Sequence, residues 1–260
     1  MGGMQPPDDP PARGGVLVLL PTYNERATLP GTVAGVLHHL PLAQILIIDD
    51  GSPDGTGRIA DQLADHPRVS VHHRAGKLGL GTAYVWGFQA AIDRGYDYVV
   101  AMDSDGSHLV SELPALVAAA EAGAGLVIGA RWVPGGKIVN WPWYRRWISR
   151  TGTAVARIAL KSRLHDLTSG FRVLDTSWLR RLDTAALDSQ GYAFQVETAW
   201  TLERMGCPIT EVPITFVERV EGRSKMTPGI VWEALRGVLR WGWRLRFGAG
   251  SSATKRGGAA

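Results

Sequence analysis

Two carboxylates one residue apart follow an apolar run in the segment 98–108, which reads YVVAMDSDGSH. Residues 98–102 are rich in strand-forming side chains, so the pattern predicts a buried strand that ends just before Asp103. If the chain stays extended there, Asp103 and Asp105 point to the same side. Mg²⁺ and Mn²⁺ prefer oxygen ligands, and two carboxylates can hold such an ion together with a substrate phosphate. The alternative is a strand-to-helix turn in which Asp103 or Ser107 caps the next helix.

The carboxylate pair belongs to a series of apolar runs that alternate with segments of helical length. Continuous apolar runs are typical of strands that are buried on both faces of a parallel sheet. The alternation predicts an α/β protein with a Rossmann-like, mostly parallel sheet flanked by helices, and Pro213 indicates an edge position for the last strand. The predicted strands are 16–20, 45–49, 69–73, 98–102, 126–130, 171–174 and 209–217, and the predicted helices are 27–39, 82–94, 111–122, 141–160, 193–205 and 230–247.

Three polar segments directly follow predicted strands, namely PTYNE at 21–25, DDGSPDG at 49–55 and DSDGSH at 103–108. Ligands of parallel α/β sheets bind beyond the carboxyl ends of the strands, so we expect the three segments to line one crevice. The glycine loop GKLGLG at 76–81 lacks the GxGxxG spacing and follows the third strand, which argues against a dinucleotide-binding dehydrogenase. The sequence also lacks the GxxxxGK[ST] phosphate loop.

Length and composition are those of an ordinary globular protein. The 260 residues suffice for one large α/β domain. The single cysteine, Cys207, excludes an intramolecular disulfide and suggests a reducing compartment. No signal-peptide pattern and no apolar run near the length of a spanning helix is visible, so we expect that the protein does not cross a membrane by itself. The predicted organisation is a disordered lead at 1–14, a globular domain at 15–227, an amphipathic basic helix at 228–247 and a disordered tail at 248–260.

Basic residues are concentrated in two segments. Residues 131–163 contain eight Lys or Arg and no Asp or Glu, and residues 218–247 contain seven basic and three acidic residues. Because the formal net charge of the whole chain is only +4, these segments are set apart from an acidic body. Such a separation of charge indicates an anionic partner, and the candidates are phosphates, a lipid surface or a nucleic acid.

The last predicted helix, 230–247, carries an apolar stripe beside a basic one. A helix that packs on a core needs only the apolar stripe. Arginines beside tryptophans also suit the headgroup region of an anionic bilayer, and both interpretations stay open. The apolar stripe consists of Trp232, Leu235, Leu239 and Trp243, and the basic stripe of Arg236, Arg240 and Arg244.

Eight motifs occur in one order over residues 20–226 and together identify a family resemblance. The chain resembles the family-2 glycosyltransferases, and within them the dolichol-phosphate and polyprenol-monophosphate mannose synthases of the actinobacterial type. The resemblance implies a GT-A catalytic domain in which a nucleotide sugar and a lipid phosphate meet at Mg²⁺ or Mn²⁺. It implies transfer of mannose from GDP-mannose to a polyprenyl monophosphate. The motifs are PTYNE, IIDDGSPDGT, GLGTA, MDSDGSH, IGAR, NWP, HDLTSGFR and ERVEGRSK.

The resemblance also implies which residues bind the donor nucleotide. Pro21, Tyr23 and Glu25 of PTYNE would hold the base and the ribose. Ile48 and Asp50, at the end of the second predicted strand, would continue the base pocket.

The DxD element of the family falls on Asp103, Ser104 and Asp105, which would carry the metal and the diphosphate. Ser107 would be a further metal ligand, directly or through a water, at a place where some relatives have glutamine.

Three basic residues match the phosphate-binding positions of the family. Arg145 would grip a donor or acceptor phosphate, and Arg219 and Lys225 would belong to a phosphate-binding loop whose freedom Gly222 supplies. Positive charges lower the barrier because the departing nucleoside diphosphate gains negative charge. Asp105, Arg145, Arg219 and Lys225 are therefore the predicted catalytic residues.

The predicted reaction needs no catalytic base. A lipid phosphate, with a second pKa near about 6, is already mostly a dianion at neutral pH. Its direct attack would invert the anomeric configuration. Two other readings keep the fold, namely transfer of glucose or another sugar from a UDP-sugar to polyprenyl phosphate, and nucleotidyl transfer with release of pyrophosphate.

A different class of function is a non-catalytic module that binds nucleic acid through the basic segments. No RRM, KH or zinc signature supports it, so we expect no nucleic-acid partner. Because the expected acceptor is a lipid, we instead expect peripheral contact of the 230–247 helix, together with the 141–147 face, with the cytoplasmic face of the cell membrane or with a membrane-embedded protein.

Overall fold

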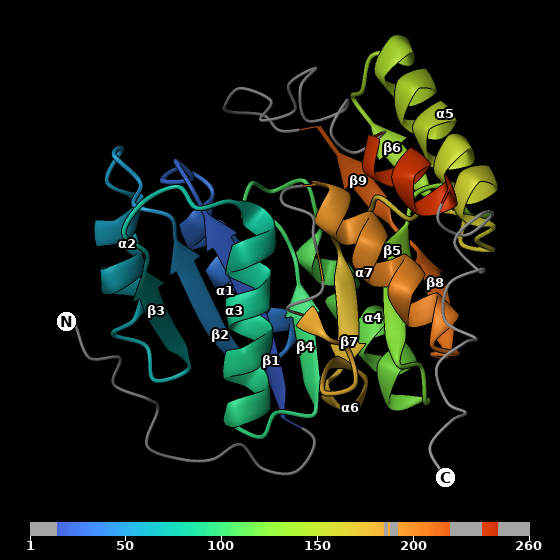
Figure 1. The fold of residues 1–260 in the computed structure, drawn as a ribbon. Coiled ribbons are helices and arrows are strands. Elements are labelled where there is room, and N and C mark those ends of the chain that lie inside the picture. The colour runs from blue at the N-terminus through green and yellow to red at the C-terminus, as the bar shows by residue number, and fades with distance from the viewer. Residues whose placement is uncertain (1–14, 185–186, 188–191, 219–235, 244–260) are drawn as a thin grey trace, which may run out of the picture.

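The computed structural model describes residues 15–184, 187, 192–218 and 236–243 and shows one seven-stranded sheet between layers of helices (Figure 1). The strand order is β3-β2-β1-β4-β7-β5-β8. Neighbouring strands are parallel except at β7, which runs antiparallel to both β4 and β5. The predicted α/β class with a mostly parallel sheet is therefore confirmed. The strands of this sheet are β1 (Val16–Thr22), β2 (Gln44–Asp49), β3 (Val69–His73), β4 (Tyr98–Ala101), β5 (Leu126–Ala130), β7 (Arg172–Asp175) and β8 (Ile209–Pro213).

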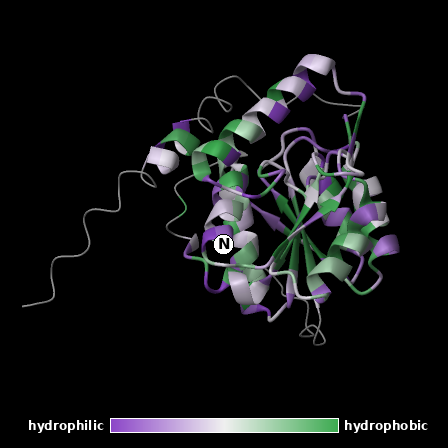
Figure 2. Cartoon of the chain, turned by 90° about the vertical axis from the view of Figure 1, so that its right-hand side faces the viewer, coloured by the Kyte–Doolittle hydropathy of each residue, from purple (hydrophilic) through white to green (hydrophobic). Residues whose placement is uncertain are grey.

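Two hydrophobic cores lie on opposite faces of the sheet. Successive residues of a strand point to opposite faces, so Leu17 and Leu19 join one core and Val18 and Leu20 join the other. This is why the central strands are continuously apolar, as Figure 2 shows by hydropathy. The helices are α1 (Leu29–His39), α2 (Thr56–Leu63), α3 (Leu80–Asp93), α4 (Leu113–Glu121), α5 (Trp143–Leu160), α6 (Thr176–Leu179) and α7 (Tyr192–Arg204), with a 3-10 helix η1 (Val110–Glu112) before α4.

The predicted strand 209–217 is wrong as a single element. The segment divides at Ile214 into two strands. Before this residue, β8 pairs with β5 at the edge of the main sheet. After it, β9 (Thr215–Val217) pairs with β6 (Lys137–Val139) in a second, small sheet. Ile214 is the residue between β8 and β9, and its buried side chain packs in the hydrophobic core. The edge position expected from Pro213 is confirmed. Helices α2 and α6 and strand β6, which have eight, four and three residues, were not predicted from the sequence.

Residues 236–243 are helical and lie beside α5 (Figure 1). Val238 and Trp241 are buried in the same core as α7, and the Trp241 ring stacks on Trp200 with 6.0 Å between ring centres. The packing interpretation of the predicted helix 230–247 therefore holds for this part of it. Among the described residues, no helix has the length and apolarity needed to span a membrane. The remainder of that helix, the lead at 1–14 and the tail at 248–260 lie outside the described residues.

Candidate active site

The three polar segments after β1, β2 and β4 lie at one edge of the sheet, as expected for adjacent parallel strands. Hydrogen bonds join the segments directly. The amide of Glu25 donates to Oγ1 of Thr56 over 3.0 Å, and the hydroxyl of Ser104 donates to the carbonyl of Pro21 over 3.2 Å. The side chains that end β1, β2 and β4 are therefore held in one place by contacts within the protein.

Tyr23 and Asp50, two of the predicted base-pocket residues, each have a basic partner. The ammonium of Lys77 lies 4.4 Å from the centre of the Tyr23 ring. A guanidinium nitrogen of Arg74 donates to Oδ1 of Asp50 over 2.6 Å and also to the carbonyl of Gly79 over 3.2 Å. Arg74 thus joins the end of β2 to the glycine loop before α3.

The other base-pocket predictions fall in different environments. Glu25 is half-buried, and its carboxylate accepts a hydrogen bond from the Thr28 hydroxyl over 3.3 Å. Pro21 is also half-buried, at the end of β1. The side chain of Ile48 is fully buried in the core under α3, so the structure places it away from the surface of the cleft. Only the backbone of Ile48 remains to contact a nucleotide.

The chain is not extended at the carboxylate pair, which corrects the geometry expected from the sequence. Strand β4 ends at Ala101, and the chain bends at residues 104–106, where Gly106 takes a φ of +79°, a left-handed conformation that favours glycine. In the resulting turn, the buried Asp105 accepts a hydrogen bond from the amide of Ser107 over 2.9 Å. The strand rule that places residues i and i+2 on one side therefore does not apply.

The capping alternative for this turn is wrong. Neither η1 nor α4 has a side-chain hydrogen bond at its N-cap, and the N-cap residues are Leu109 and Glu112. Instead, the amide of Asp103 donates to Nδ1 of His108 over 3.1 Å. The ring of His108 stacks on Phe171, with 4.9 Å between ring centres. The turn is thus held by a buried histidine, a residue that sequence reasoning did not single out.

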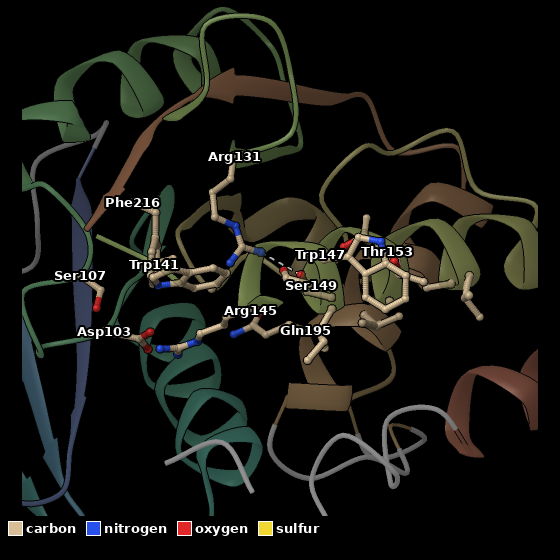
Figure 3. Close-up of a pocket in the computed structure, with 18 of the residues that line it drawn as sticks. Asp103, Ser107, Arg131, Trp141, Arg145, Trp147, Ser149, Thr153, Gln195 and Phe216 are labelled. Atoms are coloured by element: carbon tan, nitrogen blue, oxygen red, sulfur yellow. Dashed lines mark hydrogen bonds between the residues drawn. The ribbon is translucent and has the colours of Figure 1, made fainter. Parts of the chain in front are cut away.

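A cavity of about 370 Å³ lies between this turn, α5, β9 and α7 (Figure 3). Asp103, Ser107, Arg131 and Arg145 line its polar end. Its other end is mostly apolar and is formed largely by α5, with Val238 of the 236–243 helix. The cavity therefore joins charged groups to a hydrocarbon-like surface.

Helix α5 presents a regular stripe to the cavity. Arg145, Ser149 and Thr153, four residues apart, all line it, and Gly152 and Ala156 continue the same face. Residues at i and i+4 of a helix share a face. The stripe therefore grades from a cation through hydroxyls to small apolar side chains.

Arg145 lies at the polar end and is already engaged by protein groups. Its guanidinium lies 4.5 Å from the centre of the Trp141 ring and forms an ion pair with the carboxylate of Glu218. The backbone amide of Glu218 donates to the carbonyl of Val139 over 3.0 Å, which fixes the residue at the end of β9. A carboxylate therefore occupies the arginine fork that was predicted to bind phosphate.

Arg131, from the IGAR motif, forms a buried pair with Asp166 of HDLTSGFR. Its Nε and Nη2 donate to the two carboxylate oxygens over 2.8 and 2.7 Å, and Nη2 also donates to Thr168 over 2.8 Å. Burial opposes ionisation of Asp166, but the charge and hydrogen bonds of Arg131 outweigh it and lower the pKa of Asp166 below 3.8. Arg131 is thus a fixed cation in the cavity wall.

Arg172, the last residue of HDLTSGFR, is fully buried and holds the wall behind that pair. It donates to the carbonyls of Leu167, Ser169 and Gln195 over 2.7 to 2.8 Å. Burial lowers the pKa of Arg172 to about 10, which leaves it charged at neutral pH. The polar turn recognised in the sequence therefore has a structural role, which the sequence had not predicted.

The oxygen donors near the turn fit a divalent cation that arrives with a phosphate. Within the part of the chain that the structure describes, no group of three or more His, Cys, Asp or Glu forms a metal cage. Mg²⁺ is commonly held by one or two carboxylates and completes its shell with water and substrate phosphates. Asp103, Asp105 and Ser107 offer such a hard-oxygen donor set. The predicted residues Arg219, Gly222 and Lys225 lie outside the described residues.

Comparison with known sequences gives a consistent picture. Residues 17–183 match the family model described as "Glycosyl transferase family 2". The chain is 48% identical over 233 residues to "Polyprenol monophosphomannose synthase" of Mycolicibacterium smegmatis, covering 89% of this chain and 88% of that one. It is 49% identical over 233 residues to "Undecaprenyl-phosphate mannosyltransferase" of Micrococcus luteus, covering 89% of this chain and 96% of that one.

Solved structures share the fold at lower sequence identity. Glucosyl-3-phosphoglycerate synthase from Mycobacterium tuberculosis in complex with phosphoglyceric acid is 20% identical with a TM-score of 0.67, covering 87% of this chain and 79% of that one. The same protein in complex with Mn²⁺, UDP-glucose and phosphoglyceric acid is 21% identical with a TM-score of 0.66, with the same coverage.

Proposed function

The chain belongs to glycosyl transferase family 2, and from this premise we propose that it transfers mannose from GDP-mannose to a polyprenyl monophosphate. The strand order of its sheet is that of the GT-A fold, which the sequence resemblance implied. The observation that carries the proposal is the cavity with Arg131 and Arg145 at one end and apolar α5 side chains at the other. An isoprenoid phosphate has the same division into an anionic head and a hydrocarbon tail.

Several groups would bind the donor. A divalent cation, Mg²⁺ or Mn²⁺, held by Asp103, Asp105 and Ser107 would neutralise charge on the diphosphate. Asp50, which directly follows β2 and accepts from Arg74 through Oδ1, would offer its carboxylate to the base. Guanine presents N1–H and N2–H on one edge, and a carboxylate can accept both, whereas uracil presents a single N–H. Because a carboxylate can also accept the single N–H of uracil, the guanine nucleotide of the proposal rests on the sequence resemblance.

The transfer step follows from the charges in the cavity. A phosphate oxygen of the lipid forms a bond to the anomeric carbon as the bond from that carbon to the GDP oxygen breaks. Arg145 can bind the lipid phosphate after exchanging Glu218 for it, because a guanidinium matches a phosphate as well as a carboxylate. The phosphate is already a dianion at neutral pH and needs no base. Attack from the face opposite GDP gives an inverted, β-linked product.

Peripheral membrane contact through α5 is part of the proposal. Trp143 and Trp147 are 80% and 66% exposed, and the basic residues Arg146 and Arg150 lie between and beside them. Helices that carry exposed aromatic and basic side chains bind the interface of anionic membranes. On the helical residues 236–243, Leu239 and Trp243 are exposed as well. A nucleotide sugar is a cytoplasmic metabolite, so the contact would lie on the inner face of the cell membrane.

A donor panel tests the proposed function. Purified protein is offered labelled GDP-mannose, UDP-glucose or UDP-GlcNAc with polyprenyl phosphate, and lipid-soluble label is counted. We expect label only from GDP-mannose, with release of GDP and a β-linked product. Label from UDP-glucose would assign the alternative sugar, release of pyrophosphate would assign a nucleotidyltransferase, and net retention would contradict direct attack.

A further inference from the structure

Four buried polar atoms on the cavity wall have no hydrogen-bond partner among the described residues. Two of them, Nε1 of Trp141 and Oε2 of Glu218, lie beside Arg145, and the other two are Nε2 of Gln195 and Oγ1 of Thr153, whose residues are both 3% exposed. Folded proteins pair nearly all of their buried polar groups, because an unpaired one opposes folding. The two hydrogen-bond donors Gln195 and Thr153, unpaired on the wall of one cavity, therefore indicate a ligand that accepts from them.

Gln195 is held in place from behind through its backbone. Its carbonyl accepts a hydrogen bond from the fully buried Arg172 over 2.7 Å. Arg172 also binds the carbonyl of Leu167, next to Thr168, which is a partner of Arg131. The Gln195 backbone and the Arg131 guanidinium are thus fixed to the same turn, so the amide stays at a set place along the cavity.

We propose that the carboxamide of Gln195 donates a hydrogen bond to a phosphate oxygen of the lipid acceptor, with the Thr153 hydroxyl as a second donor. The inference rests on the proposed function. Figure 3 places Gln195 between the charged end with Arg145 and the end with Thr153. Arg131 and Arg145 supply positive charge, and the unpaired amide supplies a neutral donor, which together match an anion. The isoprenoid tail has no atom that can accept these bonds.

Gln195→Met separates this role from a structural one. Methionine keeps the length of the side chain and removes both polar groups of the amide. We expect the KM for polyprenyl phosphate to rise about 10- to 100-fold, as for loss of a hydrogen bond to a charged group, while the KM for GDP-mannose stays unchanged. The thermal midpoint should stay the same or rise, because the Nε2 that is removed has no partner among the described residues of the free protein.

Thr198→Val is the matched control. Thr198 lies on the same helix, is buried, and also has an unpaired Oγ1 among the described residues, but it does not line the cavity. We expect neither KM to change in this variant. An equal rise of the acceptor KM in Thr198→Val would overturn the inference, because the effect would then come from α7 as a whole.

Calorimetric titration with farnesyl phosphate and farnesol provides a readout without catalysis. We expect Gln195→Met to weaken farnesyl phosphate binding and to leave farnesol binding unchanged. Equal weakening of both ligands, unchanged affinity for farnesyl phosphate, or a lowered thermal midpoint would each overturn the assignment. If the wild type makes no mannosyl lipid, the proposed function fails, and this titration still decides whether Gln195 binds a phosphate.

Discussion

The donor-side loops (21–25, 49–55 and 103–108) and the acceptor-side cavity under α5 differ in how completely the protein pairs their polar groups. In the loops, Asp50 is bonded to Arg74, Asp105 to Ser107, and Glu25 to two threonines. In the cavity, Gln195 and Thr153 each have a polar atom with no hydrogen-bond partner in the part of the chain that the structure describes. The nearby outer surface of α5 exposes large aromatic side chains. The polar groups of the loops are paired within the protein, whereas those of the cavity require a bound ligand as their partner.

This difference matches the two substrates of the proposed reaction. A water-soluble nucleotide can bind to preformed loops at the end of a sheet, since the polar groups of these loops are paired with one another in the absence of the nucleotide. An amphipathic lipid needs an apolar cavity and an approach from a membrane, and these features lower stability while they are uncovered. Substitutions in the two regions should therefore affect different measured properties of the protein.

The largest expected effect is on the donor side. Asp105→Asn keeps the size of the side chain and still accepts from Ser107, but it removes the negative charge. We expect kcat/KM for mannose transfer to fall at least about 100-fold, because charge stabilisation at the diphosphate is lost. Excess EDTA should have the same effect on the wild type, with recovery on adding Mg²⁺ or Mn²⁺. Transfer of labelled mannose into lipid measures both.

Asp93→Asn is the control for net charge in that experiment. Asp93 lies at the end of α3 and accepts a hydrogen bond from Gln89 at the surface, away from the site. It should retain wild-type activity. Near-normal transfer by Asp105→Asn would instead place the centre of leaving-group stabilisation elsewhere.

The next effect concerns the membrane face of the acceptor side. The double variant Trp143→Ser and Trp147→Ser should bind anionic liposomes about tenfold more weakly, because two aromatic anchors are lost from the interface. Sedimentation with vesicles of mixed neutral and anionic lipid measures this. Leu42→Ser is the matched control, since Leu42 is 90% exposed but follows α1 in the donor half. Equal weakening in both variants would mean that α5 has no special part in binding.

A smaller effect is expected at the boundary between the regions. Glu218→Gln removes the carboxylate that competes with phosphate for Arg145. The pair is partly exposed, so we expect the acceptor KM to fall only about two- to fivefold, with the donor KM unchanged. Steady-state kinetics at several acceptor concentrations measure the change. A higher acceptor KM would show that Glu218 orients Arg145 for binding.

The meeting of the three loops could be predicted from the sequence because it depends on local patterns. Strands β1, β2 and β4 are continuous apolar runs, and their polar continuations must meet once the strands are parallel neighbours. The sequence could not show that Gly106 bends the chain between Asp105 and Ser107, because a glycine only permits such a φ. It also could not show that Ile48 faces the core, since both faces of β2 are buried.

The acceptor cavity was largely invisible in the sequence because tertiary contacts assemble it. Its wall combines Arg131, Gln195 and the α5 residues, which come from distant parts of the chain. Only the spacing of Arg145, Ser149 and Thr153 along α5 was a readable signal, as a polar stripe on an otherwise apolar and basic helix. Prediction of the rest would have required the packing of α7 against α5.

The smallest expected effect tests the claim that the donor side is completed by its own contacts. Burial disfavours the charged form of His73, but hydrogen bonds and charges from Asp61 and Asp49 outweigh it and raise the pKa of His73 above 6.5. Its contribution to stability is therefore fully present below pH 6.5 and is lost as the pH rises through the folded-state pKa. Because His73 is 47% exposed, we expect a loss of no more than about 0.5 kcal/mol. The difference in urea unfolding free energy between the wild type and His73→Asn should shrink as the pH rises, and a difference that is constant or grows would contradict the pairing.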